Sequence, residues 1–192
     1  FRSITEKFYQ LLNRYNNKDE IKNKINLVKE YFTNINIDLM YAFPGETIED
    51  LENDLNFFKE LDVPHISIYS LILEENTKLY INNTKPLDEE LESNMYYYII
   101  DYLEHLGYNH YEISNFSKDG YESIHNLTYW NNDKYYGFGL SAGGYIDNIR
   151  YTNTRSLNNY LKGNYIKEEE IITKEIEIKP KWKLIKIITS NH

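Results

Sequence analysis

The fold is decided by residues 35–47, which read INIDLMYAFPGET. Apolar and polar side chains alternate at the start of this segment, and that period of two predicts a β-strand over 35–41. Pro44 and Gly45 end the strand, and Thr47 can cap a helix. A strand followed directly by a helix begins a βαβ unit, so the segment predicts a parallel sheet.

The same alternation of strand and helix continues toward the carboxyl end. Helical spacing of apolar residues predicts a helix over 51–61, a second strand covers 65–71, and a long helix over 88–106 is stopped by Gly107. A third strand is expected over 111–116. Three strands cannot close a barrel, so the fold class is α/β with part of a barrel or an open sheet.

Two amphipathic helices are expected before residue 35. The first has Ile4 and Phe8 on its apolar face and runs to about Tyr15. The second begins near residue 19. Its inward-facing residues are expected to be Ile21, Ile25, Val28 and Phe32.

Chemistry in parallel α/β folds lies at the carboxyl ends of the strands, so Asp38, residues 70–73 and Asn115 are expected around one mouth. Asp38 lies among aliphatic residues on a core strand, where a buried carboxylate needs hydrogen bonds. It could accept a ribose hydroxyl or an ammonium group, and it could equally cap a neighbouring backbone.

Beyond residue 116 the pattern changes to a Gly-rich aromatic stretch, with glycines concentrated in residues 137–144. No strand-to-helix transition surrounds these glycines, so they match neither a phosphate-binding loop nor a dinucleotide fingerprint. They are expected to permit tight turns or close backbone approach. A strand near 149–152 and a short helix over 156–161 follow, and residues 166–192 have no clear period.

Composition excludes several classes of function. The 192 residues include no cysteine, which excludes disulfides, thiolate nucleophiles and a cysteine-ligated metal or iron–sulfur site within this chain. The net charge of −9 argues against a nucleic-acid partner. Neither a membrane-spanning run nor a signal peptide is found, so the cytoplasm is the expected compartment.

Two further residues are candidates on their chemistry. Arg14 could clamp a substrate, although a solvated cation near a helix end is the simpler interpretation. His125 opens the hexapeptide HNLTYW, in which an imidazole beside large aromatic rings could ligate haem iron. Composition alone favours a structural turn with Trp130 in the core.

Four motifs taken together resemble the HemW-type haem chaperones of the radical S-adenosylmethionine superfamily, which are often described as relatives of oxygen-independent coproporphyrinogen III oxidase. The motifs are INIDLMYAFPGET (35–47), ISIYSL (66–71), YEISNF (111–116) and HNLTYW (125–130). The resemblance runs from residue 1 to about 165.

The resemblance implies the carboxyl-terminal portion of a six-stranded (β/α) partial barrel over 1–117 and a mixed α+β extension over 118–165, followed by an atypical tail over 166–192. It implies that Arg14, Asp38 and the backbone of Ile72 contact S-adenosylmethionine. It also implies that His125 is the haem ligand, which reverses the structural interpretation of that residue.

The family depends on a 4Fe–4S cluster held by a CxxxCxxC motif, and this sequence has no cysteine. We therefore expect a fragment that lacks the amino-terminal cluster-binding part and cannot cleave S-adenosylmethionine. The sequence also has Glu46 where the family motif has Gln, and Ala42 and Phe43 where it has Gly and Leu.

The implied function is haem binding and delivery to acceptor haemoproteins, which could include membrane-associated ones; whether the chain acts as an enzyme stays open. One alternative is a coproporphyrinogen III oxidase, which decarboxylates propionate side chains through a radical. The other is a non-catalytic α/β fragment that binds porphyrin or nothing. The complete HNLTYW motif favours the chaperone branch.

Overall fold

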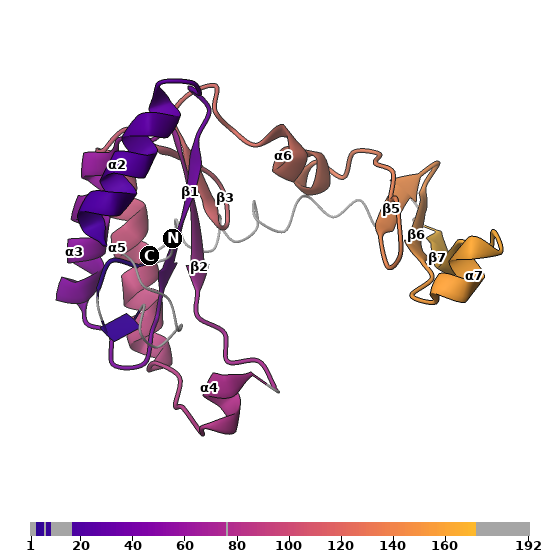
Figure 1. Cartoon of the computed structure of the whole chain (residues 1–192), viewed down its shortest axis with the longest axis horizontal. Helices are drawn as coiled ribbons and strands as arrows, with labels where there is room; N and C mark the ends of the chain where they lie inside the picture. The colour runs from indigo at the N-terminus through magenta and orange to yellow at the C-terminus, as the bar shows by residue number, and fades with distance from the viewer. Residues whose placement is uncertain (1–2, 6, 9–16, 76, 172–192) are drawn as a thin grey trace. The chain divides into compact units, whose positions relative to one another are not determined.

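A computed structural model describes residues 3–5, 7–8, 17–75 and 77–171 of the chain. The chain divides into two compact units between Glu122 and Ser123. The first unit contains a four-stranded sheet with its helices, and the second contains a three-stranded sheet (Figure 1).

Strands and helices of the first unit follow the predicted order closely. They are α2 (Lys18–Lys29), β1 (Asn36–Tyr41), α3 (Ile48–Leu61), β2 (His65–Ser70), α4 (Lys78–Ile81), α5 (Glu89–His105), β3 (Asn109–Glu112) and β4 (Asn115–Ser117). The strand order in the sheet is β1-β2-β4-β3. β1 and β2 are parallel, as the βαβ pattern predicted, and Asp38 lies opposite Ser67.

The predicted third parallel strand over 111–116 is wrong. This segment forms a tight hairpin in which β3 and β4 are antiparallel, and β4 also runs antiparallel to β2. Glu112 stabilises the reversal, because its carboxylate accepts hydrogen bonds from the backbone N–H of Ser114 (3.2 Å) and the side-chain amide of Asn115. The sheet is therefore mixed, and its antiparallel part follows a polar turn.

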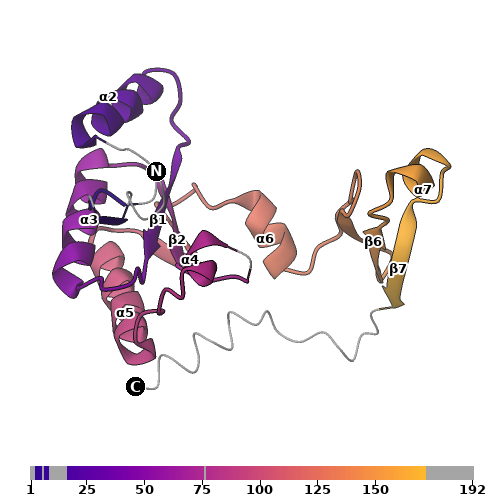
Figure 2. The same cartoon turned by 60° about the horizontal axis from the view of Figure 1, so that its bottom comes forward.

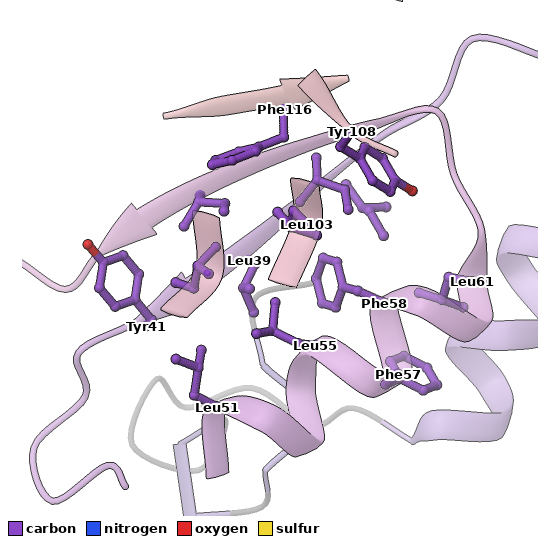
Figure 3. Packing of buried hydrophobic residues seen from close by; sticks show 14 of the residues in the cluster. Leu39, Tyr41, Leu51, Leu55, Phe57, Phe58, Leu61, Leu103, Tyr108 and Phe116 are labelled. Atoms are coloured by element: carbon purple, nitrogen blue, oxygen red, sulfur yellow. The ribbon is translucent and has the colours of Figure 1, made fainter. Parts of the chain in front are cut away.

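Helices α3 and α5 cover one face of the four-stranded sheet (Figures 1 and 2). The stripe predicted on α3 is confirmed, because Leu51, Leu55, Phe58 and Leu61 are all buried. Figure 3 shows Leu55 and Phe58 facing Leu39 of β1. The N-cap Thr47 forms a capping box with Asp50, which fixes where α3 begins. Removal of these apolar side chains from water stabilises the packing of α3 on the sheet.

The inward face predicted for α2 is only partly correct. Ile21 and Ile25 pack against the core of the first unit, but Val28 and Phe32 are exposed. The helix ends at Lys29, so Phe32 lies beyond the segment in which helical spacing applies. Within the described part of the chain, no helix has the length and apolar character needed to cross a membrane.

The second unit comprises a short helix and a small sheet. Its elements are α6 (Ile124–Trp130), β5 (Gly143–Ile146), β6 (Ile149–Asn153), α7 (Leu157–Leu161) and β7 (Ile166–Ile171), and the three strands pair in the order β5-β6-β7. A two-residue loop, Asp147 and Asn148, joins β5 to β6, and both residues have positive φ (49° and 65°). Such a loop matches the twist of the two strands.

The glycines of 137–144 do permit close approach, as predicted. A Cβ on Gly137 would overlap the carbonyl of Gly143, and one on Gly144 would overlap the ring of Tyr151. The side-chain amide of Asn153 donates to the carbonyls of Gly137 (3.1 Å) and Gly139 (2.8 Å). The Gly-rich loop is therefore held against β6.

Candidate functional site

Asp38 lies on the face of β1 opposite the hydrophobic core. Its neighbours Ile37 and Leu39 are buried, but Asp38 itself is exposed. The prediction that the flanking aliphatic residues bury this carboxylate is wrong, because the period of two in a strand turns adjacent side chains to opposite faces. The carboxylate is thus available to a ligand.

A hydrogen-bonded row supports Asp38 from the amino-terminal side of the strand. The side-chain amide of Asn36 donates to Asp38 Oδ1 (3.2 Å), and Asn36 Oδ1 accepts from Nδ1 of His65 (2.6 Å). Tyr111 donates its hydroxyl proton to His65 Nε2 (2.7 Å). Burial lowers the pKa of His65, although the Asp38 carboxylate opposes this shift. A neutral imidazole with its proton on Nδ1 satisfies both bonds.

The prediction that Asp38, residues 70–73 and Asn115 surround one mouth is wrong, because Asp38 lies in the middle of β1 and Asn115 lies on the far side of β2 at the start of β4. Asp38 lies opposite Ser67 of β2, and Ser67 lies opposite Asn115 of β4. The Ser67 hydroxyl donates to Asn115 Oδ1 (2.6 Å). Because β4 is antiparallel, Asn115 is the first residue of its strand and not the last.

Apolar side chains gather at the carboxyl end of β1. Phe43 stacks on Phe8 with ring centroids 4.6 Å apart, and Met40 and Leu71 pack against them. The backbone N–H of Leu71 donates to the carbonyl of Tyr41 (2.9 Å), which extends the pairing of β1 and β2 by one residue. Ile72 follows this bond at the start of a loop, and its side chain is 73% exposed.

Arg14, the other residue assigned to S-adenosylmethionine by resemblance, lies outside the described residues. Asp38 lies in the middle of β1 opposite Ser67, whereas Ile72 lies two residues beyond the end of β2, so the structure does not place the two at one strand end.

His125 lies in the second unit, in the first turn of α6. The hydroxyl of Ser123 caps this helix by accepting from the backbone N–H of Asn126 (3.3 Å), so the expected structural turn is a helix. The imidazole is exposed and meets the ring of Tyr129 edge to face, with centroids 4.8 Å apart. Trp130 is only half-buried and is not a core residue.

The sequence did not lead us to expect that Glu46 is buried. The signal that could have shown it is that Glu46 stands where the family motif has Gln. Glu46 is 1% exposed, and its Oε2 accepts from the backbone N–H of Phe43 (2.8 Å), whereas Oε1 has no partner among the described residues. Burial raises its pKa from near 4.5 to about 8; the Phe43 hydrogen bond opposes this, and nearby Asp54 and Asp50 add to it. Glu46 is therefore largely protonated near neutral pH.

The residues present fit two of the three groups that the resemblance implies. The exposed Asp38 carboxylate can accept hydroxyl or ammonium hydrogens, and the exposed imidazole of His125 can donate a nitrogen lone pair to iron. A cluster site does not fit, because the sequence contains no cysteine and the described residues contain no group of three metal-ligating side chains.

Proteins that carry the name Heme chaperone HemW are similar to this chain in sequence. It is 45% identical over 159 residues to Heme chaperone HemW of Lactococcus lactis, which covers 79% of this chain and 42% of the relative. Identity to Heme chaperone HemW of Bacillus subtilis is 40% over 156 residues, or 77% of this chain and 41% of the relative. The chain thus spans less than half the length of these relatives, and no family model matches it.

The fold is shared with a solved structure. Coproporphyrinogen III oxidase (HemN) of Escherichia coli, a radical SAM enzyme, superposes with a TM-score of 0.73 over 90% of this chain and 45% of that chain. The two sequences are 18% identical, so this likeness concerns the fold alone. The shared fold and the much higher identity to the two HemW proteins agree: the chain belongs to the HemW family and corresponds to less than half the length of these relatives.

Proposed function

We propose that this chain is the haem-binding part of a haem chaperone, which binds haem through His125 and delivers it to acceptor haemoproteins. The observation that carries the proposal is the exposed imidazole at the head of HNLTYW, in a chain 45% identical to Heme chaperone HemW. An axial histidine on haem needs an accessible nitrogen and apolar surroundings for the macrocycle.

The surroundings of His125 support haem as the ligand. Ile124 is 82% exposed and Tyr129 is 46% exposed, so α6 offers apolar surface on both sides of the imidazole along the chain. Neighbouring exposed apolar side chains point to a ligand or partner surface only where they form a continuous patch, and here they flank an exposed imidazole. Bound haem would supply an iron with an open axial position, and the chain would supply the nitrogen and the apolar cover.

S-Adenosylmethionine is the second proposed ligand, and it would bind in the first unit. Asp38 would accept hydrogen bonds from the ligand, Asn36 would hold the carboxylate in place, and the backbone at Ile72 would make a further contact beyond the end of β2. Arg14 completes the proposed set by resemblance. No radical step is assigned to these residues, because the ligands for a cluster are absent from the sequence.

A haem titration of the purified chain tests the main proposal. Binding should shift the Soret band, and His125→Ala should abolish the shift or weaken binding by at least tenfold. His105→Ala is the matched control, since His105 is exposed on α5 and its Nδ1 contacts the carbonyl of Asp101 (2.6 Å). An unchanged Soret shift in His125→Ala would remove His125 as the ligand. Transfer to an apo-haemoprotein, followed optically, tests delivery.

A further inference from the structure

The imidazole of His125 lacks the support that a ligating histidine ordinarily has. Such a histidine usually donates its second ring N–H to a carboxylate or a backbone carbonyl, which fixes the ring plane. Among the described residues, no group hydrogen-bonds to the His125 ring, and its ring contact is with Tyr129. The contact available to orient this exposed side chain is therefore an aromatic ring and not a hydrogen-bond acceptor.

Three aromatic rings form a ladder that supplies this support. Tyr129 follows His125 by four residues on α6, so the two side chains share one face of the helix. The His125 and Tyr129 rings meet at an interplanar angle of 85°, and the Tyr129 ring meets Tyr135 at 69° with centroids 4.5 Å apart. Edge-to-face contacts of this kind are favourable and directional.

The far end of the ladder is fixed to the sheet. Tyr135 pairs with Tyr145 of β5 through two backbone hydrogen bonds of 2.9 and 2.8 Å, and Tyr145 is buried. A second connection lies beside it, because the Arg150 guanidinium of β6 donates to Asn132 Oδ1 (2.7 Å) just after α6. The position of the Tyr129 ring therefore follows that of the sheet.

We propose that Tyr135 is a positioning residue for His125 and that it acts through the ring of Tyr129. The inference rests on the proposed haem function, because it assigns a role toward the same ligand. An imidazole held in one orientation loses less side-chain entropy when it binds iron, so the ladder raises the affinity for haem and fixes the ring plane relative to the macrocycle.

Haem titrations of single variants of the whole chain test this role. Tyr135→Leu and Tyr129→Leu should each weaken haem binding about threefold to tenfold, the factor that corresponds to the loss of one aromatic pair. Tyr135→Phe keeps the ring and should bind as the wild type does. Tyr136→Leu is the control: its ring is 68% exposed and stacks on Phe138, outside the ladder.

Two further measurements separate positioning from a general loss of structure. In a Tyr129→Leu background, Tyr135→Leu should add no further loss, because its effect passes through the missing ring. The electron paramagnetic resonance signal of the ferric complex should broaden in the leucine variants as the imidazole plane becomes variable. Far-UV circular dichroism reports whether each variant folds. If the leucine variants are unstable, the haem affinity of Tyr135→Phe still tests the role, because this variant keeps the aromatic ring and should bind haem as the wild type does.

The possible failures are distinguishable. If His125→Ala binds haem normally, the proposed function fails and the positioning role fails with it. If His125→Ala loses binding but Tyr135→Leu does not, only the positioning role is overturned. A loss on Tyr135→Leu that is equal with and without Tyr129 also overturns it, because the ladder would then not transmit the effect.

Discussion

Replacing Glu46 with Gln should stabilise the first unit at neutral pH and have a much smaller effect in acid. Glu46 is buried in the turn between β1 and α3, where only Oε2 has a hydrogen-bond partner among the described residues. Its pKa is raised to about 8 by burial. Gln carries no charge and keeps an oxygen that can accept from the backbone N–H of Phe43.

The size of the effect follows from proton linkage. A carboxyl group with a raised pKa contributes most stability below its unfolded value, near 4.5, and that contribution is lost as the pH rises toward the folded value of about 8. Each pH unit within this window costs up to about 1.4 kcal/mol. Between pH 5 and pH 7, wild type should therefore lose about 2.5 kcal/mol relative to the Gln variant.

The assay must report on the first unit and compare variants at each pH. Hydrogen–deuterium exchange of the α3 amides, corrected for the intrinsic rate, gives the free energy of opening locally. Asp54 also has a raised pKa through burial, and His65 has a lowered one, so the wild-type pH profile combines several groups. The difference between wild type and Glu46→Gln isolates Glu46.

The control is Glu49→Gln, which removes an exposed carboxylate from the first turn of the same helix. It should change the opening free energy by less than about 1 kcal/mol. The reasoning is refuted if wild type and Glu46→Gln have parallel pH profiles between 5 and 7, because a buried ionisable carboxyl group would then be contributing nothing.

Three further substitutions test packing and hydrogen bonding. Asp54→Ala should lower the free energy of unfolding by about 1–3 kcal/mol, because Asp54 accepts a hydrogen bond from the backbone N–H of Ile4 (3.1 Å). Asp54→Asn should retain that bond, and urea titration of the two variants compares their free energies of unfolding. Gly137→Ala should destabilise the second unit by about 2 kcal/mol or more, since its Cβ would overlap the Gly143 carbonyl. Unfolding followed by Trp130 fluorescence in a Trp182→Phe background would register this, and an unchanged midpoint would contradict the close approach. Ser67→Ala should cost about 1–2 kcal/mol by removing its bond to Asn115, and a loss below 0.3 kcal/mol would argue that this bond is not formed in solution.

Elements specified by nearby residues were predictable from the sequence. The alternation of 35–41 predicted β1, and Thr47 predicted the start of α3 because a cap acts within a few residues. Gly107, with φ of 83°, ends α5 as expected. These features depend only on neighbouring residues, so a single sequence is enough to predict them.

Features that depend on distant partners were not predictable in the same way. The β3–β4 hairpin was interpreted as one strand, because its turn has no Gly or Pro and relies on the Glu112 carboxylate. The support of Asp38 was missed for a related reason: Asn36 and His65 are 29 residues apart and meet only through strand pairing. β7 was missed because four consecutive charged residues separate its two terminal isoleucines, so its sequence lacks the period of two expected of a strand.

The candidate site also has features set by nearby residues, which were predictable, and features set by distant partners, which were not. HNLTYW identifies His125 by resemblance, but the ring contacts of Tyr129 with Tyr135 require the fold of the second unit. Likewise, the period of two fixes the face on which Asp38 lies, yet its exposure was mispredicted because apolar neighbours were taken as evidence of burial.

The two-residue loop at Asp147 and Asn148 also affects the order in which the strands pair during folding. A hairpin whose strands are joined by so short a loop closes within about 1–10 μs, because its first contacts are local. β1 and β2 can pair only after the intervening α3 has been accommodated, and such separated contacts form more slowly. We therefore expect the β5–β6 hairpin to be an early folding nucleus, one that gives the second unit its shape before the parallel strands of the first have met.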